Sequence, residues 1–112
     1  MAQVTPKWFT PLTEEKKENP KKFKVGPLNS VQLWEVNTHF KMIDSEHIGL
    51  SFEGQKLALK YGLLDWENVK DEDGKDAKCN QANWHLVDSW CLNFAAKEIL
   101  SLSELADAER KN

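Results

Sequence analysis

Hydrophobic and polar positions along the chain predict a series of helices joined by short extended segments. Apolar residues recur at helical spacing between residues 30 and 42, and Asn29 or Ser30 can cap a helix there. The predicted apolar face carries Val31, Trp34, Phe40, and Leu33 or Val36. A second helix is predicted over residues 52–61, ending at Gly62 because glycine accepts the positive φ of a helix terminus.

The second half of the chain predicts an extended segment, a turn and two more helices. Residues 64–69 are expected to be extended, and the acidic run 71–76 forms a turn in which Gly74 supplies the positive φ. The longest helix is predicted over residues 81–99. A short final helix follows, because Ser101 and Glu104 have the spacing of a capping box.

The N-terminal residues 1–22 contain three prolines among lysines and glutamates, which opposes regular helix or sheet. We therefore expect an extended or flexible arm over residues 1–22 and a helical domain over residues 23–112. The fold class is predicted as mainly α: a small single domain of three or four helices with one or two short β segments.

Trp8 and Phe9 stand out within this arm, since adjacent aromatics are costly to expose. They predict an anchor that docks on the domain or on a neighbouring subunit, and a local collapse without a partner is an equal alternative. Residues 23–25 alternate as a short strand would.

Charge narrows the possible partners. The chain has 112 residues and a net charge of −3, with six lysines and three glutamates (+3) in residues 1–24 and therefore −6 in the remainder. Such a balance does not favour nucleic acid or anionic membranes. The basic end is best interpreted as a solvated tail.

The two cysteines indicate a reducing compartment. Neither a signal peptide nor an apolar run long enough to cross a membrane is found, so we expect a cytosolic protein. Eleven residues separate Cys79 from Cys91 without a nearby Cys/His pattern, which argues against zinc. Cys91 is expected to be a small buried apolar residue.

No constellation of catalytic or metal-ligating residues is predicted. His47 with Asp44 and Glu46 is better interpreted as a solvated loop than as a metal site. An EF-hand alignment that sets Gly74 at position 6 places Val69 at position 1 and Asn80 at position 12, so calcium ligation fails. We therefore predict no enzyme activity, no catalytic residue, no metal and no cofactor.

The aromatic content favours association with other chains. Five tryptophans are many for this length, and surplus apolar surface usually indicates a binding face. One compact core that holds all five is the alternative. The candidate protein-binding residues are Trp8, Phe9, Trp66 and Trp90.

Three features together resemble the tail assembly chaperones of long-tailed (siphovirus-type) bacteriophages. The first is the arm leading into the sequence Phe-Lys-Val-Gly-Pro-Leu at residues 23–28 and then directly into a helix. The second is the block at residues 62–69, Gly-Leu-Leu-Asp-Trp-Glu-Asn-Val, followed by Asp-Glu-Asp-Gly at residues 71–74. The third is a C-terminal helix pair with a charged tail. Residues 77–80 depart from the Pro-Phe-Ser/Thr helix start of many relatives.

The resemblance implies a non-enzymatic viral protein that binds the tape-measure protein, helps recruit the tail-tube protein and self-associates around its client. It implies action in the host cytoplasm and absence from the mature virion. It also implies that a ribosomal frameshift near the gene's end can yield a longer product. The alternative functions are a small structural virion protein, such as a tail or head–tail connector component, and, more distantly, a host-directed regulator.

Overall fold

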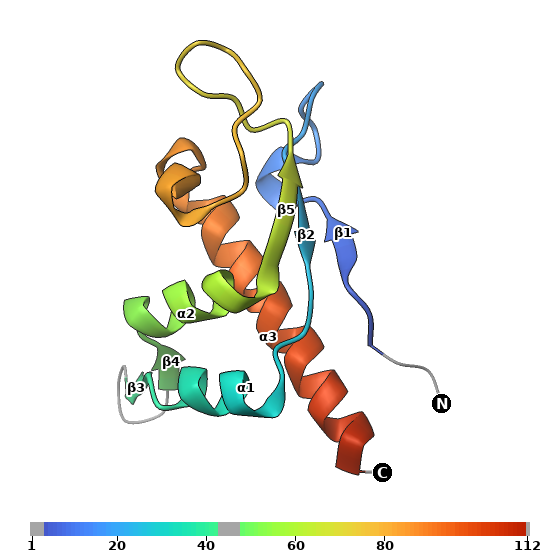
Figure 1. Cartoon of the computed structure of the whole chain (residues 1–112), viewed down its shortest axis with the longest axis vertical. Helices are drawn as coiled ribbons and strands as arrows, with labels where there is room; N and C mark the ends of the chain where they lie inside the picture. Colours follow the sequence, from blue (N-terminus) through green and yellow to red (C-terminus); the bar gives the residue numbers. More distant parts are fainter. Residues whose placement is uncertain (1–3, 43–47, 112) are drawn as a thin grey trace.

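The computed structural model describes residues 4–42 and 48–111, in which one long helix supports a small sheet and two shorter helices (Figure 1). The helices are α1 (Ser30–Asn37), α2 (Phe52–Gly62) and α3 (Ser89–Lys111). The strands β1 (Lys7–Phe9), β2 (Lys22–Val25) and β5 (Leu63–Glu67) form an antiparallel sheet in the order β1-β2-β5. None of the described helices is both long and apolar enough to cross a membrane.

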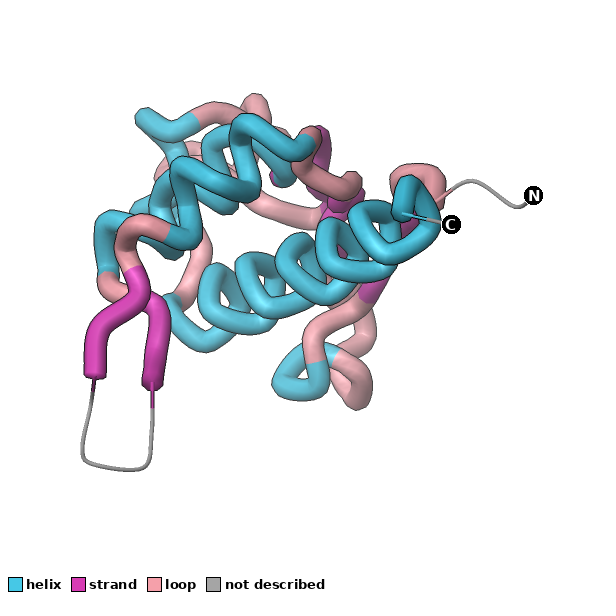
Figure 2. Tube along the Cα trace, turned by 90° about the horizontal axis from the view of Figure 1, so that it is seen from below, coloured by secondary structure: helices cyan, strands magenta, loops and turns pink. Residues whose placement is uncertain are grey.

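Three smaller elements complete the described chain. Strands β3 (Phe40–Met42) and β4 (Ile48–Leu50) pair as a separate antiparallel hairpin, which projects away from the helices in Figure 2. The 3₁₀ turns η1 (Leu12–Glu14) and η2 (Gln81–Leu86) lie before β2 and α3. The predicted polar break that contains His47 lies outside the described residues.

The prediction of a mainly α fold is wrong, because the chain is a small α+β domain, about 51% helical and 15% strand. The sheet belongs to the core: the side chains of Phe23 and Val25 on β2 are fully buried. Each strand is only 3–5 residues long, and β1 lies in the proline-rich segment. Strand pairing joins distant segments, so local periodicity does not reveal it.

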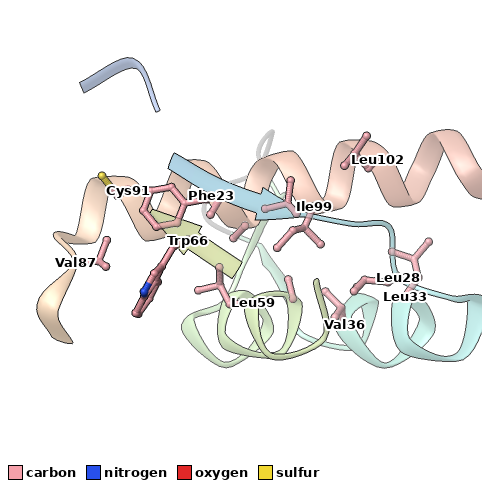
Figure 3. Close-up of a cluster of buried hydrophobic side chains, with 14 of the residues drawn as sticks. Phe23, Leu28, Leu33, Val36, Leu59, Trp66, Val87, Cys91, Ile99 and Leu102 are labelled. Carbon is pink, nitrogen blue, oxygen red and sulfur yellow. The ribbon is translucent and has the colours of Figure 1, made fainter. Parts of the chain in front are cut away.

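One hydrophobic core joins the sheet to all three helices. Figure 3 shows Phe23 and Trp66 on neighbouring strands, with Cys91 and Ile99 of α3 on one side and Leu59 of α2 below. The remaining buried apolar residues are Val25, Leu28, Leu33, Val36, Ala58, Val69, Val87, Ala95, Ala96 and Leu102. A buried face of α3 therefore runs along the whole core. This face includes Cys91, whose predicted burial is confirmed.

Helix α1 confirms the predicted cap and only part of the predicted face. Asn29 accepts a hydrogen bond from the Gln32 amide at 2.8 Å and completes a capping box. The helix ends at Asn37, so Phe40 lies in β3 instead. Leu33 and Val36 are the buried residues, whereas Val31 and Trp34 are 66% and 72% exposed. Apolar residues lie on several sides of this short helix, so their spacing alone does not distinguish the buried residues from Val31 and Trp34.

The predicted helix over residues 52–61 is confirmed as α2, but Gly62 is required for a different reason. Gly62 lies at the end of the helix and is buried, and a Cβ built on it would lie 2.4 Å from Ile99 Cγ2. Close packing on α3 therefore excludes any side chain there. The turn prediction is confirmed at Gly74, whose φ is +78°.

The predicted C-terminal helices have different boundaries. Residues 81–86 form η2, Val87 is extended, and α3 begins at Ser89, with the Asp88 carboxylate accepting a hydrogen bond from the Cys91 amide at 2.9 Å. Helix α3 then continues to Lys111, so no separate final helix is capped at Ser101.

Within α3 the important serine is Ser103. Its fully buried hydroxyl donates to the Ile99 carbonyl at 2.6 Å and accepts from the Leu28 amide at 2.8 Å. The connection from β2 to α1 is thereby fixed to the long helix.

Substituting Gly62→Ala should destabilise the domain by about 1–3 kcal/mol, because the new methyl group overpacks against Ile99. Chemical denaturation of Gly62→Ala, Ile99→Ala and the double variant measures this effect. The double variant should lose at least about 0.5 kcal/mol less than the sum of the single losses, since removing the Ile99 side chain makes room for the methyl group. Strict additivity would contradict the contact.

Candidate functional site

Residues 4–21, named the strap from here on, lie across the sheet edge and α3. Strand β1 pairs with β2 in the register Lys7–Val25, Trp8–Lys24 and Phe9–Phe23. Lys7 forms an ion pair with Glu98 of α3. At the other end of the strap, Asn68 donates a side-chain hydrogen bond to the Pro20 carbonyl at 2.6 Å.

The strand register aligns side chains in rows across the sheet. One row is aromatic: the Phe9 and Phe23 ring centroids are 6.1 Å apart, and Trp66 meets Phe23 edge to face at 6.4 Å. The Trp66 indole also donates a hydrogen bond to the Ala77 carbonyl at 2.8 Å. The row therefore connects the strap, the central strand and the chain beyond the acidic turn.

Glu14 is the most unusual side chain of the strap, because its carboxylate is fully buried. It forms an ion pair with Lys17 and accepts a hydrogen bond from the Lys21 amide at 3.0 Å, and Lys21 Nζ lies 3.6 Å away. Burial alone would raise the pKa of Glu14, but hydrogen bonds and charge from Lys17 and Lys21 outweigh it and lower the pKa. Glu14 therefore stays ionised and holds this part of the chain together.

Glu14, Asp88 and Cys91 place one ligand-type atom each within 4.8 Å of one another. The chemistry of this cluster does not favour a metal ion. The Glu14 carboxylate already pairs with lysines, and Asp88 caps α3. Burial raises the pKa of the Cys91 thiol to about 11, whereas metal ligation requires the thiolate. We interpret the cluster as the meeting point of two local contacts: Glu14 pairs with lysines within the strap, and Asp88 caps α3.

An apolar groove lies between the beginnings of α2 and α3. Its cavity is about 250 Å³, and its apolar lining residues are Phe52, Leu59, Trp90 and Leu92, with Gln55, Ser89 and Asn93 between them. Phe52 and Trp90 are 69% and 63% exposed. Lys56 Nζ lies 5.2 Å from the Phe52 ring centroid and adds a positive charge to the rim.

Two large aromatics beside one hollow are typical of a protein-binding surface. Across the described part of the chain, every buried side-chain nitrogen or oxygen has a hydrogen-bond partner. The groove itself offers apolar contact, because Phe52, Leu59, Trp90 and Leu92 line it.

The four predicted binding residues lie in different environments. Trp90 is on the groove, and Trp8 is 42% exposed on β1. Phe9 is half-buried against Phe23, and Trp66 is only 6% exposed. The structure thus brings Phe9 and Trp66 onto the two sides of Phe23, and it separates both of them from Trp90. The binding prediction for all four residues stays a prediction.

Sequence reasoning missed Phe52 and Glu14. Phe52 was assigned to the helix start without a role, because its neighbour Trp90 is 38 positions away in the sequence. Glu14 looked like one of several solvated charges. The signal that was present is its spacing to Lys17, which is typical of a helical ion pair.

The acidic turn after β5 is organised by its own residues. Asp71 Oδ1 accepts hydrogen bonds from the Asp73 and Lys75 amides at 2.9 and 3.0 Å. The exposed side chains of Glu72 and Asp73 remain in solvent. The predicted turn is therefore confirmed, and hydrogen bonds from backbone amides to the Asp71 side chain stabilise it.

Comparison with known protein families, curated proteins and solved structures found no match to this chain.

The two carboxylates of Glu14 and Asp88 predict a loss of stability at acid pH. Glu14 and Asp88 both have lowered pKa values, so the stability they contribute is complete above the unfolded-state pKa and is lost as the pH falls through the folded-state pKa. Glu14→Gln should cost about 1–3 kcal/mol at pH 7, and its stability should then fall less steeply below pH 4.5. Denaturant titrations at several pH values measure both effects.

Glu15→Gln is the matched control, because Glu15 is exposed beside Glu14. The control should change stability by less than about 0.5 kcal/mol. Equal losses in the two variants would contradict the role assigned to Glu14.

Proposed function

We propose that this protein is a non-enzymatic phage tail assembly chaperone that binds the tape-measure protein and assists assembly of the tail tube. The observation that carries the proposal is the groove at which Phe52 and Trp90 expose their side chains around an apolar hollow. Aromatic residues at such a site contribute most of the binding energy in protein interfaces. A chaperone needs a surface of this kind to hold an apolar client.

The walls of the groove favour a helical client. Phe52 and Trp90 lie in the first turns of α2 and α3, and all residues that line the groove belong to these two helices, so the groove contains no sheet edge with which a strand could pair. An extended peptide binds by pairing with free backbone groups, whereas an amphipathic helix inserts apolar side chains and satisfies its own backbone. The family resemblance implies that the client is the tape-measure protein, which has long apolar helices. Such a client fits this second mode.

The remaining parts of the proposal come from the resemblance carried by residues 23–28 and 62–74. They are recruitment of the tail-tube protein, self-association around the client, action in the host cytoplasm and absence from the finished particle. A structural virion protein is the competing function, and mass spectrometry of purified particles distinguishes the two. Abundant copies of this chain in mature particles would contradict the chaperone function.

Co-expression with fragments of a phage tape-measure protein tests client binding. The unmodified chain should co-purify with a helical fragment, and Phe52→Ala and Trp90→Ala should each weaken capture by about thirtyfold, because loss of a central aromatic typically costs about 2 kcal/mol. Thermal unfolding should change little, since both side chains are mostly exposed.

Trp34→Ala is the matched control, because Trp34 is an equally large and 72% exposed aromatic on a different helix. Its capture should equal that of the unmodified chain. Failure to capture any tape-measure fragment would contradict the proposed client. Capture that survives both groove substitutions would contradict the groove as the binding site.

A further inference from the structure

Lysine side chains border the apolar groove on both of its helices. Lys56 Nζ lies 5.2 Å from the centroid of the Phe52 ring, which lines the groove. Lys60 follows one turn later on α2 and borders a neighbouring hollow together with Lys56. On α3, Lys97 lies one turn beyond Asn93, which also lines the groove. All three lysines are exposed, so the rim of the groove is cationic.

These rim lysines are available to a partner. Between side chains that the structure describes, the lysines that form ion pairs are Lys7, Lys17, Lys21 and Lys70. None of those four lysines lines the groove. The charges of the rim are therefore not used in holding the described fold together.

Two acidic residues lie near the groove, and they offset the rim charge only in part. Asp88 precedes α3, and its carboxylate already accepts a hydrogen bond from the Cys91 amide at 2.9 Å. Glu53 shares the neighbouring hollow with Lys56 and Lys60, so one carboxylate there stands against two ammonium groups. The rim keeps an excess of positive charge.

The helix backbones add positive potential at the same place. Phe52 is the first residue of α2, and Ser89 and Trp90 are the first two residues of α3, so the N-termini of both helices border the groove. The aligned peptide dipoles of a helix place about half a positive elementary charge at its N-terminus. Lysines and helix ends thus act with the same sign on whatever enters the groove.

We propose that the groove binds an amphipathic helix whose apolar stripe is flanked by aspartate and glutamate residues. The apolar side chains of that helix fill the hollow of about 250 Å³, and its carboxylates lie beside the rim lysines. An acidic flank is attracted by the rim and a basic flank is repelled, so charge selects among apolar helices that fit equally well. The inference rests on the proposed function, because it specifies the client of the same groove.

Two synthetic helical peptides test the charge preference. Both carry the same leucine stripe, and the flanking positions are all glutamate in one peptide and all lysine in the other. Fluorescence anisotropy of the labelled peptides at low salt should show about tenfold tighter binding of the glutamate peptide, since each exposed ion pair contributes up to about fivefold. Salt at about 1 M should remove most of the difference by screening. Equal affinities at low salt, or tighter binding of the lysine peptide, would overturn the proposal.

Charge reversal at the rim locates the source of the preference. In the double variant Lys56→Glu/Lys97→Glu, the preference for the glutamate peptide should be lost or reversed. The matched control is Lys16→Glu/Lys75→Glu, which changes the net charge equally at exposed positions in the strap and the acidic turn. The control should keep the preference. A preference that survives in the rim variant, or that the control abolishes equally, would overturn the proposal.

Comparing the peptides with tape-measure fragments separates this inference from the proposed function. Tight, Phe52-dependent binding of the glutamate peptide without capture of any tape-measure fragment would support the acidic-helix site and contradict the client. Capture of fragments through Phe52 and Trp90, with no preference between the peptides, would retain the client and overturn the acidic-helix inference. Dimers of this chain that Phe52→Ala separates and that the glutamate peptide does not displace would also overturn it, because a second copy would then occupy the groove.

Discussion

The aromatic row Phe9–Phe23–Trp66 is the contact on which the other features depend. Phe23 is fully buried between two ring neighbours that come from the strands on either side of β2, Phe9 on β1 and Trp66 on β5. Through Phe9 it holds the strap, and through Trp66 and its hydrogen bond to the Ala77 carbonyl it holds the chain after the acidic turn. Segments that are distant in sequence are thereby fixed to one strand, and α3 closes the core behind them (Figure 3).

This arrangement separates the residues that pack the core from the residues of the proposed binding groove. Trp66, which the sequence suggested as a binding residue, lies in the core, so substituting it would test the stability of the fold. Phe52 at the start of α2 and Trp90 at the start of α3 line the groove, where their exposed side chains contribute little to folding. Side chains of the groove can therefore be substituted with little effect on stability, while the aromatic row maintains the fold.

Local chemistry predicted those features whose causes are close in sequence. The Asn29 cap, the turn at Gly74 and the burial of Cys91 follow from neighbouring residues and were found as expected. The three-stranded sheet, the contact of Gly62 with Ile99 and the pairing of Glu14 within the strap depend on the tertiary arrangement. For the same reason the sequence identifies Trp90 as a candidate but not Phe52, which lines the same groove from a different helix.

The five tryptophans allow a direct test of where a client binds, because each indole N–H gives its own NMR signal and they report on separate parts of the molecule: Trp8, Trp34, Trp66, Trp84 and Trp90. On addition of a helical tape-measure fragment, the Trp90 signal should shift most, while the signals of Trp8 and Trp34 should stay in place. Shifts concentrated at Trp8 or Trp34, with Trp90 unchanged, would contradict the groove as the client site.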